Sequence, residues 1–137
     1  MSMSFINGHN VTAYGAIVVL DRSCGNTPWR KLGWYVMPPG GSALVMTGNQ
    51  HDLPFTNFAW FACTAADGPS WTGNLWYRIP HNNPFNQCFV DDTGCNALWP
   101  FLADQYGGGW SSLDIILRTP GAPNQEFQGD WTVARTP

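Results

Sequence analysis

The chain has 137 residues, 44% of them hydrophobic and 11% charged, with a formal net charge of −3 at pH 7. This length fits one domain spanning residues 1–137. The six Lys and Arg residues form neither the basic stripe that nucleic-acid binding needs nor a polybasic membrane anchor, and the longest apolar stretch, 11–20, is too short for membrane insertion.

The predicted elements are short strands rich in β-branched and aromatic residues, separated by turns. We expect them, in chain order, at residues 11–20, 32–37, 42–47, 57–64, 71–79, 85–90, 113–119 and 131–135. Clusters of Gly, Pro and Asn lie between them, of which Pro38-Pro39-Gly40-Gly41 is the strongest turn signal. Seven or eight short strands predict an all-β, single-domain antiparallel β-sandwich or flattened barrel.

One segment has a helical pattern. Asn96 can cap a short helix over residues 97–105, in which Leu98, Phe101, Leu102 and Gln105 recur at helical spacing. Pro100 is compatible with this helix only in its first turn.

The N-terminus does not have the pattern of a secretory signal. No basic region precedes a long apolar run in Met-Ser-Met-Ser-Phe-Ile. We therefore expect a cytoplasmic protein or one released by a route that needs no signal; removal of a signal from this sequence is the third alternative.

The four cysteines permit two disulfides in three connectivities. Cys88 and Cys95 enclose a short loop and form the candidate local pair, with four reduced, buried thiols as the alternative. Their spacing does not match a zinc finger or ribbon, and we expect neither a metal nor a cofactor. Asp91-Asp92-Thr93-Gly94 could offer oxygens to calcium, but a tight turn explains it more simply.

Catalytic groups are sparse, and we expect no enzymatic activity. Glu126 is the one glutamate, so a glycosidase would have to draw its two carboxylates mainly from Asp residues in turn-like contexts. The sequence has no nucleophile elbow, phosphate loop or dinucleotide fingerprint.

Eight tryptophans carry the strongest functional signal. Each combines a large apolar ring system with one N–H donor, so each can serve a core or a stacking platform. Four lie in apolar strands and are expected in the core: Trp34, Trp60, Trp71 and Trp131. Trp99 has no clear assignment.

The first candidate platform is centred on Trp76. In a strand over residues 71–78, side chains alternate, which places Thr72, Asn74 and Arg78 on the same face as Trp76. An aromatic ring among amide, hydroxyl and guanidinium groups is typical of a sugar- or peptide-binding surface. Burial of Trp76 under a second sheet or a subunit contact is the alternative.

Two further platforms are weaker. Tyr106 and Trp110 flank three glycines, whose backbone can approach a ligand closely; the alternative is a helix-to-strand turn with Trp110 tucked inward. Trp29-Arg30-Lys31 sets basic charge beside an aromatic ring, which could stack or bind a carboxylate.

Several short motifs resemble a family of small bacterial β-domains with a Gly-Trp-Tyr/Trp signature. They are Asn10-x-Thr12, Gly33-Trp34-Tyr35, Pro39-Gly40, Trp71-Thr72-Gly73, Phe85-x-x-Cys88 and Trp131-Thr132-Val133. The resemblance implies a β fold and supplies no catalytic residues. The chain departs from it in a Gly-rich insert before Leu113 and an extra loop before Trp131.

These observations favour a non-catalytic, lectin-like module that binds a glycan or another small polar ligand. The alternative is a self-assembling fibre, tube or shell subunit, because interface cores are poor in charge and rich in Trp and Tyr. Both readings are compatible with a homo-oligomer.

Overall fold

The computed structural model describes residues 2–47, 55–107, 110–123 and 125–137 and, apart from residues 46, 47, 55, 56 and 106, their side chains. Strands and turns dominate the described residues, as the sequence predicts, and a 3-10 helix, η1, covers Arg22–Cys24. The strands are β1 Ser2–Asn7, β2 Ala13–Leu20, β3 Trp29–Met37, β4 Ser42–Thr47, β5 Phe55–Cys63, β6 Ser70–Trp71, β7 Leu75–Ile79, β8 Phe85–Cys88, β9 Ala97–Gly107, β10 Ser112–Leu117 and β11 Trp131–Thr136.

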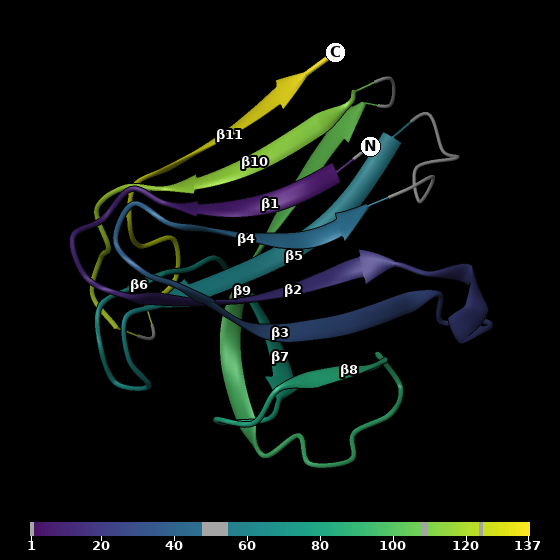
Figure 1. Cartoon of the computed structure of the whole chain (residues 1–137). Helices are drawn as coiled ribbons and strands as arrows, with labels where there is room; N and C mark the ends of the chain where they lie inside the picture. The colour runs from purple at the N-terminus through teal and green to yellow at the C-terminus, as the bar shows by residue number, and fades with distance from the viewer. Residues whose placement is uncertain (1, 48–54, 108–109, 124) are drawn as a thin grey trace.

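The strands form two sheets, both visible in Figure 1. The smaller sheet has the order β11-β10-β1-β4, and the larger has the order β7-β9-β5-β2-β3-β8, with β6 paired to β5. The larger sheet is antiparallel and curls into a half-barrel, so that its two edge strands approach each other at the bottom of Figure 1.

The smaller sheet contains a strand that the sequence reading missed. In β1, Met3, Phe5 and Asn7 are buried and alternate with half-buried residues, which is the signature of a strand with one face on a core. β1 lies between β4 and β10 and runs parallel to β10. The predicted antiparallel β-sandwich is confirmed, and it contains this one parallel pair among the described strands.

The smaller sheet packs against one face of the larger sheet, which we call the sandwich face. Phe5 of β1 meets Trp60 of β5 edge-on at 6.2 Å between ring centroids, and Trp60 meets Trp131 of β11 at 5.6 Å. Gly15 of β2 makes room for this contact, because a Cβ there would lie 2.9 Å from the Phe5 ring. Side chains from both sheets thus form one continuous apolar core.

The opposite, concave face of the larger sheet holds a second cluster, built around Trp34. A bulge in the pairing of β2 with β3 sets Gly15 opposite Tyr35 and Ala16 opposite Gly33, so Trp34 is the extra residue and turns to the concave face. Its ring lies edge-on to the rings of Phe61, Phe85 and Trp99 at centroid distances of 5.7–6.0 Å.

The predicted helix over 97–105 is wrong: this segment is the long strand β9. β9 pairs with β5 over Leu102–Gly107 and with β7 over Ala97–Phe101, so two partners satisfy its backbone. Pro100 lies in the part that pairs with β7 alone, which suits a residue without an N–H donor. No helix among the described residues has the length and apolar character needed to cross a membrane.

The predicted Cys88–Cys95 disulfide is also wrong, because Cys88 bonds to Cys24 with an S–S distance of 2.14 Å. β8 pairs with β3 so that Cys88 lies opposite Arg30, next to the turn that holds Cys24. Cys95 is a half-buried free thiol, and Cys63 is a buried one.

Candidate functional site: a groove in the half-barrel

The concave face of the half-barrel is only partly filled by side chains. Residues at its centre, among them Ala16 and Phe61, are packed in the second cluster. On either side of this cluster the interior is open, because the floor there is made of small residues. Val18, Ala59 and Ala103 lie side by side across β2, β5 and β9. Above them is a groove of about 740 Å³.

Aromatic side chains line the walls of the groove. Trp29 comes from the start of β3, Phe89 follows β8, and Tyr77 comes from β7. Tyr77 and Phe89 meet edge-on at 5.1 Å between ring centroids, so the two edges of the curled sheet touch here. Trp29 and Phe89 are joined by a backbone hydrogen bond from Phe89 N to Trp29 O at 2.8 Å. The aromatic walls therefore belong to a connected frame.

Polar residues gather at one end of the groove. Asn57 of β5 and Gln105 of β9 are register partners and both are exposed, and Thr27 lies across from them. Asp104 is the register partner of Phe58, so its half-buried carboxyl group lies on the sandwich face. Burial there raises the pKa of this carboxyl group above the ordinary value, and the Gln105 backbone N–H partly opposes that rise. The polar end of the groove therefore offers amide and hydroxyl groups beside an apolar floor.

The groove is chemically suited to hold a ligand with both apolar and hydroxyl-bearing faces. Aromatic rings and the Ala and Val floor can contact C–H surfaces, while Asn57 and Gln105 can donate and accept hydrogen bonds. Among the described residues, no group of three or more His, Cys, Asp and Glu side chains is arranged to hold a metal ion.

A smaller cavity of about 390 Å³ lies beyond the central cluster, at the other end of the concave face. Tyr14, Trp34, Cys63 and Trp99 line it, with His81 and Asn82 at its rim. Burial raises the pKa of the Cys63 thiol to about 12, so this cavity presents a neutral, apolar surface. We regard the larger groove, with its polar end, as the candidate site.

The structure separates the residues of the predicted Trp76 platform. Trp76 is 43% exposed on β7, and Asn74 and Arg78 are exposed near it. Thr72 is fully buried: its hydroxyl donates to the Gln125 carbonyl and accepts from the Gln128 N–H at 3.0 Å. The strand assumed over 71–78 is interrupted between β6 and β7, where Gly73 packs against the β9 backbone, so Thr72 cannot serve a ligand at Trp76.

The second predicted platform does not form as expected. Trp110 is 2% exposed and belongs to the core between the sheets. The Tyr106 side chain and residues 108–109 lie outside the described residues. The third candidate, Trp29, does line the groove, but its neighbours Arg30 and Lys31 do not.

The remaining tryptophans divide largely as the sequence indicates. Trp60 and Trp71 are fully buried, and Trp34 and Trp131 are half-buried against the two clusters. Trp99, without an assignment from sequence, is buried beside Trp34. Tyr77, Phe89, Asn57 and Gln105 were missed, because the groove joins single residues from separate strands.

Comparisons with known proteins leave the groove as the main guide to function. No protein-family model matches the chain, and neither curated proteins nor solved structures provide a significant match. The resemblance to small bacterial β-domains with a Gly-Trp-Tyr/Trp signature stays a prediction.

Proposed function

We propose that this protein is a non-catalytic, lectin-like binding module whose ligand is a carbohydrate held in the groove of the half-barrel. One observation carries the proposal: aromatic walls at Trp29, Tyr77 and Phe89 share the groove with the polar groups of Asn57 and Gln105. Sugars present C–H faces that stack on aromatic rings and hydroxyls that need paired donors and acceptors.

The size and charge of the groove agree with this class of ligand. Its volume of about 740 Å³ lies within the range of about 300–1,000 Å³ that is usual for small-molecule sites. Asp104 is the one acidic residue among the lining residues and its carboxyl group lies on the sandwich face, so neutral hydroxyl-rich ligands suit the groove better than charged ones.

The experiment is a glycan array followed by calorimetry with the best ligand, using two Trp→Ala variants as a matched pair. Trp29→Ala removes a groove wall and should weaken binding at least ten-fold, whereas Trp76→Ala, on the exposed side of β7, should leave it unchanged. Gln105→Ala should weaken binding without loss of fold, as checked by near-UV circular dichroism.

Two results would contradict the proposal. One is the absence of any glycan bound at high protein concentration. The other is a ligand whose affinity depends on Trp76 and not on Trp29, which would place the site on the surface expected from sequence.

Self-association is the second candidate function, and it rests on the exposed side of β7 and β9. Trp76 and Leu98 are 43% and 48% exposed there, and β7 is an edge strand of its sheet. Exposed apolar side chains beside a free strand edge favour pairing with a second copy. Sedimentation of the wild type and of Trp76→Lys tests this: an assembly through this edge should shift to the monomer in the variant, and a wild-type monomer at micromolar concentration would exclude it.

A further inference from the structure

A buried lysine and a free cysteine lie in contact beneath the groove. Lys31 of β3 is 1% exposed, and its Nζ is 3.2 Å from the Cys95 Sγ. The same Nζ is 3.4 Å from the Asp92 carboxylate and 3.4 Å from the Arg78 carbonyl oxygen. An ammonium group has three N–H donors, and these three acceptors match that number. The sulfur is therefore a full partner of the buried charge.

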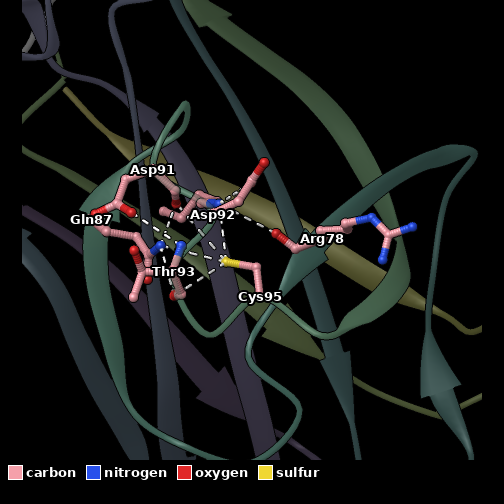
Figure 2. Close-up of polar contacts among 7 residues, drawn as sticks. Arg78, Gln87, Asp91, Asp92, Thr93 and Cys95 are labelled. Carbon is pink, nitrogen blue, oxygen red and sulfur yellow. Dashed lines mark hydrogen bonds and ion pairs between the residues drawn. The ribbon is translucent and has the colours of Figure 1, made fainter.

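Further polar groups surround the sulfur, as Figure 2 shows for Gln87, Asp91 and Thr93. Gln87 Nε2 lies 3.4 Å from Sγ and also donates to the carbonyl oxygens of Asp91 and Thr93. Those two oxygens lie 4.0 and 3.9 Å from Sγ, where they can accept from an S–H. The turn is held in place because Asp91 Oδ1 accepts from Thr93 N at 3.0 Å. Donors and acceptors thus fix the position of a thiol that remains partly exposed.

The charges around Lys31 also favour the sulfur as a partner of the buried ammonium group. Its carboxylate partner, Asp92, is 70% exposed, so water weakens that ion pair while the ammonium stays buried. A negative charge on Cys95, closer to the ammonium than Asp92 is, would compensate the buried cation better. A partly exposed sulfur beside a cation is a setting in which cysteine nucleophiles occur, and the exposed Asp91 carboxylate also interacts with Lys31.

The other cysteines do not share this setting. Cys63 is buried in apolar surroundings that raise its pKa to about 12, and Cys24 and Cys88 form a disulfide. The chain therefore carries its own reference thiol, with the same chemistry and no cation beside it.

We propose that Cys95 is an oxidation-sensitive modification site, at which the sulfur held by Lys31 reacts with hydrogen peroxide to give a sulfenic acid. The sulfur attacks one peroxide oxygen, an S–O bond forms, and the O–O bond breaks. The departing hydroxide takes the thiol proton and leaves as water, so sulfur loses two electrons and the peroxide gains them. Lys31 acts as a positioning residue, whose ammonium group stabilises negative charge on the sulfur and on the departing oxygen.

The test treats the whole disulfide-containing protein with hydrogen peroxide and a 1,3-diketone probe that labels sulfenic acids, and measures each cysteine by peptide mass spectrometry. Cys95 should be labelled at least ten-fold faster than Cys63. Lys31→Met should slow labelling of Cys95 about ten-fold, and Lys31→Arg, which keeps the charge, should recover part of the rate. Equal rates at the two cysteines, or a Cys95 rate unaffected by Lys31→Met, would overturn the proposal.

A second variant covers the case in which Lys31→Met loosens the fold, which faster labelling of Cys63 would reveal. Asp92→Asn removes the exposed carboxylate that competes for the ammonium and leaves the buried residues intact. Cys95 labelling should then accelerate about two- to five-fold with Cys63 unchanged. An unchanged or slower Cys95 rate in this variant would contradict the role of Lys31.

Discussion

The two faces of the larger sheet are built from the same strands but are filled differently. On the sandwich face, Phe58, Trp60 and Ala62 of β5 pack against the smaller sheet in one continuous core. On the concave face, Ala59 and Phe61 of the same strand meet only the curled ends of their own sheet. Because the sheet curls over itself, its own side chains cover the centre of the concave face. The ends of that face stay open where small residues form the floor.

This difference separates stability from binding. Both faces hold large rings in mutual contact, but a second sheet covers the sandwich face, so that face should carry most of the free energy of folding. On the concave face, the aromatic rings of Trp29, Tyr77 and Phe89 form the walls of the groove and are only partly buried. Substitutions on the two faces should therefore have distinguishable effects.

The largest effect is expected for Trp60→Ala on the sandwich face. Trp60 is fully buried between Phe5 and Trp131, and its truncation should lower the free energy of unfolding by about 3–5 kcal/mol through lost contacts and a cavity. Tyr77→Ala on the concave face should cost about 1–2 kcal/mol, because that ring is half-exposed. Urea unfolding measures both, and equal losses would show that the concave face is packed as tightly as the sandwich face.

The second-largest loss in the free energy of unfolding is expected on removal of the disulfide, which links two segments beside the walls of the groove. Cys24 and Cys88 are 64 residues apart in sequence, and Cys88 precedes the wall residue Phe89. The Cys24→Ser, Cys88→Ser double variant should lose about 2–4 kcal/mol, because the unfolded chain regains the entropy of an open loop.

Cys95→Ser is the control for the disulfide, since it removes a half-buried free thiol and should change stability by less than about 1 kcal/mol. If the double variant unfolds at the same urea concentration as the wild type, the bond does not constrain the chain. Weaker ligand binding in the double variant, with the sandwich core intact, would sharpen the distinction between the faces.

How much of this was predictable from sequence also differs between the two faces. The strands of the larger sheet that cover the sandwich core, such as residues 57–64, were visible because large apolar residues gather in them. β9 was misread because Leu98, Phe101, Leu102 and Gln105 fit a helical period, while Phe101, Ala103 and Gln105 fit a strand equally well. Pairing with β5 and β7, which no local pattern records, decides between them.

The groove and the disulfide were hidden for a related reason. Trp29, Asn57, Tyr77 and Gln105 come from four strands, and only the curl of the sheet brings them together. Cys24 meets Cys88 because β8 returns to pair with β3, whereas loop length alone favoured Cys95. The alternation of side chains along a strand can indicate that Trp76 is exposed. It cannot show that other residues form the concave face of the larger sheet.

The smallest effect is expected outside both faces, at the turn after β2. Asp21 caps η1 by accepting from Ser23 N and Ser23 Oγ at 2.9 and 2.6 Å, and it pairs with Arg30 at 2.7 Å. The hydrogen bonds from Ser23, followed by that from Arg30, lower its pKa from 3.8 to about 2. Since the folded state holds the carboxylate more strongly than the unfolded chain, the stabilisation is complete above about pH 4 and is lost as the pH falls towards 2.

Because the Asp21 carboxylate is largely open to water, its contribution to the free energy of unfolding should stay below about 1 kcal/mol. Asp21→Asn should be less stable than the wild type at pH 5 and should converge with it near pH 2, as measured by urea midpoints across that range. Parallel curves would mean that the carboxylate contributes nothing in its charged form. A loss well above 1 kcal/mol would mean instead that this turn anchors the groove wall at Trp29 through Arg30, and that the concave face depends on its rim as strongly as on the disulfide.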